Sequence, residues 1–131
     1  MNVPEIETKN IAIIAHDQKK RILATWVFNN LEKLRHHRIC STATTGGIIR
    51  EKCPQLVIQT TKSGPLGGDQ QIGALIAEQA IDLLIFFTDP LSPHPHDVDV
   101  KVLSRLAVVY DVPMACSGAT ADLIAKSGYH D

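Results

Sequence analysis

Short apolar runs that alternate with helical patterns are the feature that most constrains how this chain can fold. Residues 11–15 are continuously apolar, which is typical of a strand covered on both faces in a parallel sheet. Residues 81–87 are the most strand-like stretch of the chain, so we expect them to be central and buried. Three further strands are predicted at residues 38–42, 56–60 and 112–116.

Between the predicted strands, apolar residues recur at the spacing of helices. A short helix is expected after the glycines near residue 46, and a last one at residues 120–126. The expected inner faces of the three longer helices are Ile22, Leu23, Trp26, Val27, Leu31 and Leu34; Ile72, Leu75 and Ile76; and Val102, Leu103, Leu106, Ala107 and Tyr110. Right-handed crossovers then predict an α/β fold: a single three-layer αβα domain with a central, mainly parallel five-stranded sheet.

Length and charge limit the function classes. The 131 residues suffice for one domain, spanning residues 1–131, that buries a core without disulfides or metal staples. A net charge of -1 gives no basic field for nucleic acid or a membrane surface, so small molecules or copies of the chain are the expected partners. No apolar run reaches the roughly 20 residues of a membrane span, and residues 1–9 lack the apolar core of a signal peptide, which predicts a cytoplasmic location.

The three cysteines, Cys40, Cys53 and Cys116, lack C-x-x-C spacing and are expected to be buried thiols.

Polar residues gather where the predicted strands end. His16 and Asp17 follow the first strand, and the loops at 42–47, 63–71 and 89–99 follow the next three. Ligands of such folds bind outside the carboxyl ends of the strands, so this edge is the predicted functional site.

The loop at residues 42–45 offers three threonine hydroxyls and backbone donors at the start of a helix, which suits either a bound phosphate or simple helix capping. Lys20 supplies a positive charge nearby, and Ser63 with Gly64 adds a hydroxyl and a backbone N–H, which favours the anion site. No G-x-x-x-x-G-K-[ST] motif is present, so nucleotide hydrolysis is not expected.

Residues 63–71 combine glycines at 64, 67 and 68 with an aspartate, Asp69. Glycines allow positive φ and a close approach of a ligand to main-chain N–H groups. Asp69 stands where the next helix would begin, so it either caps that helix or presents its carboxylate to a ligand.

Residues 93–99 contain four groups able to bind a metal, namely His94, His96, Asp97 and Asp99. We predict no metal here, because zinc ligands normally stand at defined helical or turn spacings. Either aspartate can cap the following helix, and His96 either bonds to the backbone or donates to a substrate carbonyl as negative charge develops there. An anion cradle, a carboxylate in a tight loop and a histidine match proton abstraction next to a carbonyl in a phosphorylated substrate, such as a small ketose or aldose phosphate.

A series of motifs runs along the chain: IAHDxxK at 14–20, TxTTG at 42–46, SGPxGGDQQxGALI at 63–76, LIFFxDPL at 84–91, PHDxDVK at 95–101 and ATAD at 119–122. In this order the motifs resemble the methylglyoxal synthase family, over nearly the whole chain from residue 11 to 123. The resemblance implies conversion of dihydroxyacetone phosphate to methylglyoxal and inorganic phosphate, without a cofactor, in a soluble homohexamer that phosphate inhibits.

The resemblance also implies a role for each matching residue. Asp69 is similar to the family's catalytic base, His96 and the N–H of Gly64 would stabilise the enolic oxygen, and His16 would contact the substrate. The implied phosphate-binding positions are Lys20, Thr42, Ala43, Thr44, Thr45, Ser63 and Gly64, and the acidic residues implied to assist the base are Asp17 and Asp99.

The chain departs from the family pattern at three places: Ala43 stands where glycine is usual, Val98 where proline is common, and Ser117-Gly118 where asparagine is often seen. Two other functions stay open. A ligand-sensing domain of the same fold needs the phosphate cradle but no base, and an aldose–ketose phosphate isomerase shares the enediolate but retains the phosphate.

Overall fold

The computed structural model describes residues 7–91 and 100–129. Within these residues the strands form one five-stranded sheet in the order β3-β2-β1-β4-β5, and each neighbouring pair is parallel. The strands are β1 (Asn10–Ala15), β2 (Arg38–Thr42), β3 (Ile58–Thr61), β4 (Leu83–Phe87) and β5 (Met114–Ala115). The predicted five-stranded parallel sheet is thus confirmed, with the two most apolar runs at its centre.

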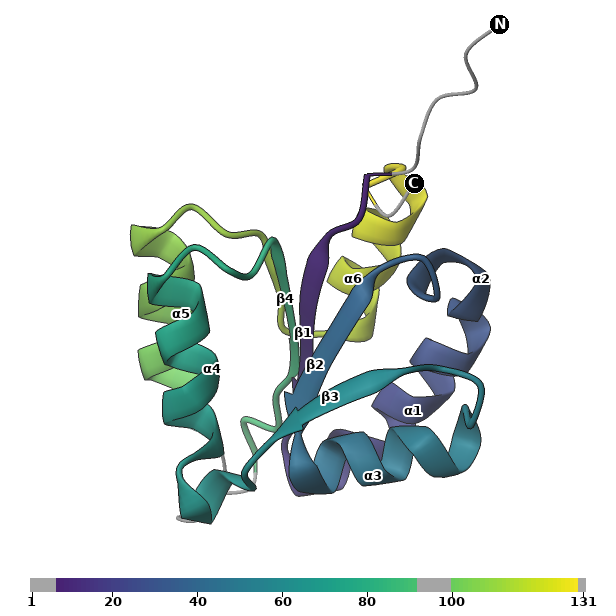
Figure 1. Cartoon of the computed structure of the whole chain (residues 1–131), viewed down its shortest axis with the longest axis horizontal. Helices are drawn as coiled ribbons and strands as arrows, with labels where there is room; N and C mark the ends of the chain where they lie inside the picture. The colour runs from purple at the N-terminus through teal and green to yellow at the C-terminus, as the bar shows by residue number, and fades with distance from the viewer. Residues whose placement is uncertain (1–6, 92–99, 130–131) are drawn as a thin grey trace, which may run out of the picture.

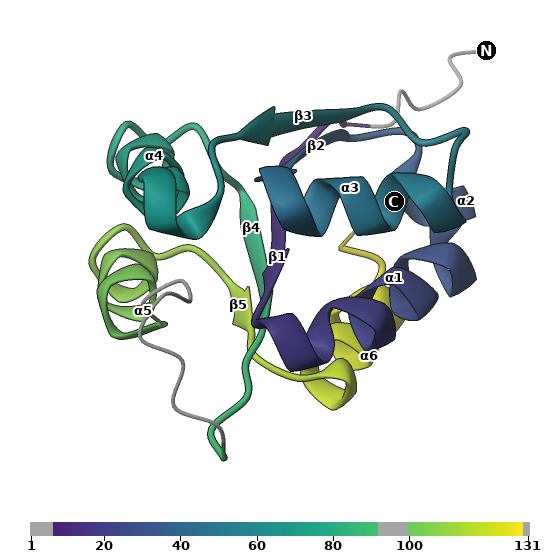
Figure 2. The same cartoon turned by 90° about the horizontal axis from the view of Figure 1, so that it is seen from below.

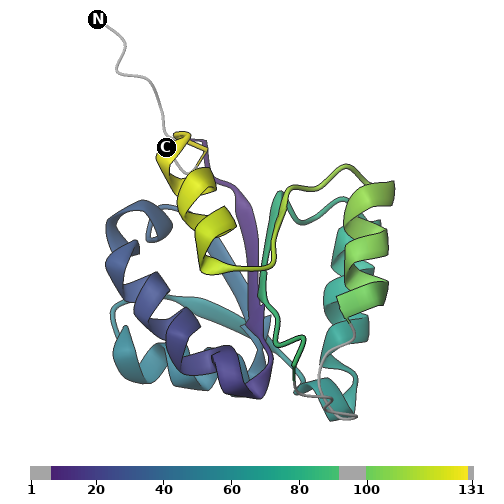
Figure 3. The same ribbon diagram turned by 180° about the vertical axis from the view of Figure 1, so that it is seen from behind.

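Helices cover both faces of this sheet and make the fold a three-layer α/β arrangement (Figures 1 and 3). One layer holds α1 (Lys20–Asn29), the short α2 (Leu31–Leu34), α3 (Ala43–Lys52) and α6 (Gly118–Lys126). The other holds α4 (Gly68–Ala77) and α5 (Val100–Val109). Two short 3-10 helices, η1 (Asp17–Lys19) and η2 (Gly64–Leu66), precede α1 and α4. In the described part of the chain, no helix has the length and apolar character needed to span a lipid bilayer.

The core consists of two apolar clusters, one on each face of the sheet. Successive side chains of a strand point to opposite faces, so Ile11 and Ile13 of β1 pack in the cluster of α1, α3 and α6. Ala12 and Ile14 pack in the cluster of α4 and α5 instead. Residues of β4 divide in the same way. Burial on both faces explains why these strands are continuously apolar rather than alternating.

The observed elements differ from the predicted ones mainly at their ends and on two helical faces. β3 begins at Ile58 rather than at residue 56, and Val57 before it is 83% exposed. Ile22 and Val102, expected on inner helical faces, are 54% and 51% exposed, so these two predictions were wrong. β5 spans two residues instead of five, because its paired backbone is limited to Met114 and Ala115.

The cysteines were predicted to be buried, and only one of them is fully so. Cys53 is buried, Cys40 is half-buried and Cys116 is exposed. Burial raises the pKa of the Cys40 thiol to about 11, so this thiol stays protonated and unreactive near neutral pH. Cys116 is exposed because it follows the short strand β5 and lies just before the N-terminus of α6.

The order of the strands creates a switch point between β1 and β4. The chain moves outward from β1 to β2 and β3, then returns to place β4 on the other side of β1. The pairings Ala15 with Phe87 and Thr42 with Thr61 bring the strands' carboxyl ends to one edge. In Figure 1 this edge is at the bottom, and Figure 2 views the molecule from that side. In such folds, ligands bind in the crevice at a switch point.

One buried hydroxyl of the sheet gives a testable prediction of stability. Ser41 of β2 is completely buried, and its Oγ has no hydrogen-bond partner among the described residues. Burying an unsatisfied hydroxyl costs roughly 1 kcal/mol or more. We therefore expect Ser41→Ala to raise the free energy of unfolding by about 1 kcal/mol, measured by urea denaturation. A fall in that free energy would show instead that the hydroxyl is satisfied in solution.

Candidate active site

His16 lies at the switch point, directly after β1. Its backbone N–H donates to Phe87 O at 3.1 Å, and its Nδ1 accepts from the backbone N–H of Asp89 at 2.9 Å. An Nδ1 that accepts a hydrogen bond carries no proton, so the neutral ring holds its proton on Nε2. His16 is 9% exposed, and its ring lies edge-on to Phe86, with 5.0 Å between the ring centroids. This imidazole is therefore held in one orientation and one tautomer.

Lys20 and Asp17 form an ion pair at the same edge. Lys20 begins α1 and is 8% exposed, whereas the carboxylate of Asp17 in η1 is largely exposed. The Lys20 Nζ donates to Asp17 Oδ1 in this pair. The carboxylate fixes the position of a nearly buried ammonium group, and an incoming anion would share that ammonium with it.

The threonine loop forms the N-terminus of α3. Thr42 precedes the helix, but its side chain makes no capping hydrogen bond; Thr42 Oγ1 lies 3.3 Å from Thr45 Oγ1 instead. Both hydroxyls are buried, while Ala43 and Thr44 are exposed. The capping alternative for Thr42 therefore does not hold in this structure. The first N–H groups of a helix have no partner within the helix, so this end of α3 presents donors that suit an anion.

The glycine loop, residues 62–68 between β3 and the start of α4, requires glycine at two positions for different reasons. Gly67 adopts φ +99°, which side-chain-bearing residues rarely adopt. At Gly68 a Cβ atom would lie 1.8 Å from the backbone oxygen of Lys62, so only glycine fits. Gly64 has no positive φ. The loop is closed by backbone hydrogen bonds, among them Gly68 N–H to Ser63 O at 2.9 Å.

Asp69 is the second residue of α4, and its carboxylate does not cap the helix. The N-cap is Gly67, and no side chain caps α4. Asp69 Oδ1 is buried and has no hydrogen-bond partner within residues 7–91 and 100–129. Buried polar atoms are nearly always satisfied in folded proteins. A buried carboxylate oxygen without a partner in the described part of the chain is therefore an unusual feature of this edge.

Two further residues orient this edge, and sequence reasoning did not identify either of them. Asp89 holds His16 through its backbone N–H, and Gln71 Oε1 accepts from Lys62 N–H at 2.8 Å, which ties the glycine loop to α4. Both lie in the motifs of the family resemblance. No local pattern indicated their contacts, because each joins segments that are separated along the chain.

Most of the predicted site residues are thus brought to one edge, from the ends of β1, β2 and β3. His94, His96, Asp97 and Asp99 lie in residues 92–99, outside the described residues, so their predicted roles stay predictions. Among the residues that the structure does describe, no group of His, Cys, Asp and Glu is arranged to hold a metal ion.

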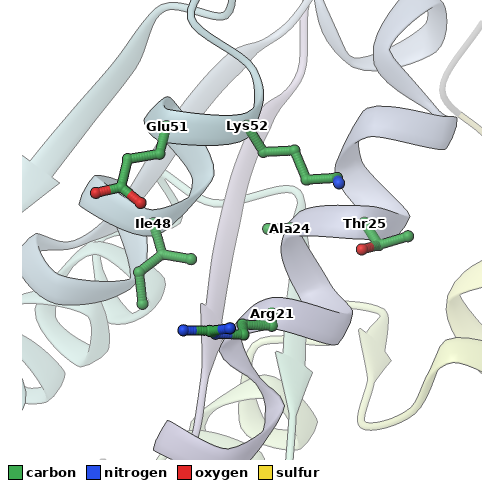
Figure 4. A pocket seen from close by; sticks show the side chains of 6 residues that line it. All are labelled: Arg21, Ala24, Thr25, Ile48, Glu51 and Lys52. Carbon is green, nitrogen blue, oxygen red and sulfur yellow. The ribbon is translucent and has the colours of Figure 1, made fainter.

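A separate cavity of about 510 Å³ lies between α1 and α3 (Figure 4). It is lined by Arg21, Ala24, Thr25, Ile48, Glu51 and Lys52. Lys52 lies over the ring of Phe28, with Nζ 5.6 Å from the ring centroid. None of the predicted site residues that the structure describes lines this cavity, which is therefore distinct from the carboxyl edge.

Comparison with known proteins identifies the family of the chain. The family model of the MGS-like domain matches residues 24–116. A methylglyoxal synthase of Rhizobium rhizogenes is 57% identical over 122 residues, which are 93% of this chain and 97% of the relative. One from Oleidesulfovibrio alaskensis is 51% identical over 121 residues, covering 92% and 82% of the two chains.

A solved structure supports the same assignment. The crystal structure of methylglyoxal synthase from Elizabethkingia anophelis NUHP1 matches with a TM-score of 0.89 and 48% identity. The match covers 94% of this chain and 80% of that one. Family model, relatives and fold all agree, and we conclude that this chain belongs to the methylglyoxal synthase family of enzymes.

Proposed function

We propose that this enzyme converts dihydroxyacetone phosphate to methylglyoxal and inorganic phosphate through an enediolate. The observation that carries the proposal is Asp69, whose buried Oδ1 has no hydrogen-bond partner among the described residues and lies at the strand edge where a substrate would bind. A carboxylate that makes no capping bond is available to take a proton from a substrate carbon. Family membership supplies the reaction class.

Phosphate binding is the first part of the proposal. The uncapped N-terminus of α3 offers the N–H groups of residues 43–45, and Lys20 offers a full positive charge. The hydroxyls of Thr42, Thr44, Thr45 and Ser63 and the N–H of Gly64 complete the proposed phosphate site. Backbone donors, a helix N-terminus and an ammonium group together suit a dianion.

Proton abstraction is the second part. Asp69 removes a proton from the hydroxymethyl carbon, and negative charge develops on the neighbouring carbonyl oxygen. His16 carries its ring proton on Nε2, and we propose that this N–H, together with His96 and the N–H of Gly64, stabilises that oxygen. Asp17 and Asp99 assist around the base. No metal or cofactor takes part in the proposed steps.

Elimination is the third part and separates this reaction from isomerisation. The departing C–O bond must lie roughly perpendicular to the plane of the enediolate. The phosphate site therefore has to hold the phosphate out of that plane and stabilise its leaving charge. For phosphate to leave, the central oxygen gains a proton and the terminal hydroxyl loses one, so that the terminal C–O becomes an aldehyde as the C–O bond to phosphate breaks. The released enol then takes up a proton on its CH2 carbon and ketonises to methylglyoxal.

The decisive experiment incubates the purified enzyme with dihydroxyacetone phosphate and follows released phosphate and methylglyoxal together. We expect equimolar formation of both in phosphate-free buffer. Glyceraldehyde 3-phosphate as the product would favour the isomerase instead. Binding of the substrate without turnover would favour a sensor domain.

Replacing Lys20 tests the phosphate site. We expect Lys20→Ala to raise KM for dihydroxyacetone phosphate about tenfold or more, because a charge-assisted hydrogen bond contributes roughly 1.5–3 kcal/mol. Lys19→Ala is the matched control, since the neighbouring lysine is not part of the proposed site. Steady-state kinetics measures both. An unchanged KM with full activity in the first variant would remove Lys20 from the phosphate site.

We also propose that the 131 residues form one domain, that the enzyme is a cytoplasmic homohexamer, and that inorganic phosphate inhibits it by occupying the phosphate site. Exposed apolar residues on α5, such as Val108 at 81% and Val109 at 64%, offer surface that an assembly would bury. Sedimentation velocity should give six times the 14.3 kDa mass of the chain. A sedimenting species of a single chain would contradict the hexamer.

A further inference from the structure

Trp26 and Asp122 form a hydrogen bond that none of the steps above uses. Trp26 Nε1 donates to Asp122 Oδ1 at 2.9 Å and joins α1 to α6, across 96 residues of sequence. Trp26 is 7% exposed, whereas Asp122 lies on the exposed side of α6. The bond therefore fixes the indole of a nearly buried ring from the surface of the molecule.

The ring that the bond fixes lies against Phe87, the last residue of β4. The Trp26 and Phe87 rings meet edge-to-face at 64°, with 6.2 Å between their centroids. The start of α6 approaches the same ring, because a Cβ atom at Gly118 would lie 3.9 Å from Phe87 Cζ. Phe87, 3% exposed, belongs to the same buried apolar cluster as Trp26 of α1 and Ala121 of α6, the two helices that the hydrogen bond joins.

The backbone around Phe87 in turn orients His16. Phe87 O accepts from His16 N–H at 3.1 Å, and Asp89 N–H donates to His16 Nδ1 at 2.9 Å. Between these two residues, Thr88 N–H donates to Cys116 O at 3.2 Å, just before α6. The backbone of residues 87–89 therefore sets the imidazole's direction, and the first residue of this segment carries the ring against which Trp26 packs.

We propose that Trp26 and Asp122 are positioning residues, which act through Phe87 to aim the Nε2–H of His16 at the bound substrate. The inference rests on the proposed function for the role of His16 itself. Small displacements of an aligned catalytic group lower the reaction rate by large factors. A hydrogen bond remote from the substrate can therefore affect the catalytic rate.

The chain offers a matched control, because α6 is also held at its other end. Lys33 Nζ donates to Ala125 O at 2.6 Å. Lys33→Met removes that bond and loosens α6 without touching Trp26 or Phe87. If Asp122 only holds α6 in place, Asp122→Ala and Lys33→Met should change the kinetic constants to a similar extent. If Asp122 positions His16, only Asp122→Ala should change them.

We would measure kcat, KM and Tm for Asp122→Ala, Asp122→Asn and Lys33→Met. Asp122→Ala is expected to lower kcat/KM about tenfold and to raise KM, since His16 contacts the substrate less well. Asp122→Asn retains an acceptor oxygen and should restore both constants. Lys33→Met should lower Tm but leave KM unchanged. Equal effects of Asp122→Ala and Lys33→Met on KM, or no rescue by asparagine, would overturn the proposal.

Trp26 is the single tryptophan of the chain, so its fluorescence gives a readout that does not depend on turnover. Saturating inorganic phosphate should change its emission in the native enzyme and in Lys33→Met, and the change should be lost in Asp122→Ala. An identical response in all three proteins, or none in the native enzyme, would contradict the coupling. Absence of methylglyoxal formation by the native enzyme would overturn the proposed function instead, and the two failures are thereby distinguished.

Discussion

Asp69→Asn is expected to lower kcat for methylglyoxal formation by at least about 100-fold, the factor typical of losing a general base. An amide has nearly the shape of the carboxylate but cannot accept the substrate's proton. Substrate binding should change little, because the proposed phosphate site does not include this side chain. Since Oδ1 is buried without a partner among the described residues, the neutral amide should leave Tm unchanged or raise it.

Asp82→Asn provides the control for this variant. Asp82 lies just before β4, at the opposite edge of the sheet, and its Oδ2 accepts from Asn10 N–H at 2.8 Å. The amide oxygen can accept the same bond, so full activity is expected. If Asp69→Asn retained near-normal kcat, Asp69 would be a structural residue of α4 and the proposed mechanism would need another base.

Gly68→Ala should destabilise the fold and nearly abolish activity. The added methyl group would lie 1.8 Å from Lys62 O, which is a backbone atom that no rotation of a side chain can move away. The loop and the start of α4 have to separate, which costs about 1–3 kcal/mol of unfolding free energy. Asp69 is the next residue, so kcat should fall about 100-fold through its displacement.

Gly47→Ala makes the same chemical change where space is free. Apart from its chain neighbours and the backbone of its own helix, no atom of the described residues lies within 4 Å of a Cβ built on Gly47, which lies within α3. Alanine favours a helix over glycine by up to about 1 kcal/mol, so this variant should be more stable than the native protein. Urea denaturation and steady-state kinetics of both variants test the contrast. Native stability in Gly68→Ala would show that the loop adapts without cost.

The sheet could be predicted because its signal is local. Residues 11–15 are apolar in sequence, and burial on both faces demands such a run. Helical faces were harder to assign. Ile22 and Val102 continue an apolar pattern around their helices, and periodicity cannot distinguish an apolar residue that packs inward from one left at the surface. Only the packing of the layers decides between these positions.

The site was predicted less completely than the sheet, for a related reason. Sequence order and strand polarity place His16, residues 42–45 and Asp69 at one edge, and the structure does so. Hydrogen-bond partners follow from contacts between distant segments. Whether Asp69 caps α4, or which nitrogen of His16 accepts from Asp89, depends on backbone geometry that no local pattern encodes.

The return of the chain to β1 also affects when the site can form during synthesis. His16 and Asp89 are 73 residues apart, and they meet only after β4 has paired with β1. Contacts between distant segments require closure of a long loop and form later than local ones. A nascent chain on the ribosome can therefore assemble β1, β2, β3 and their helices while His16 still lacks the backbone N–H of Asp89 that orients its ring. The carboxyl edge of the sheet is complete only once the second half of the chain has emerged from the ribosome.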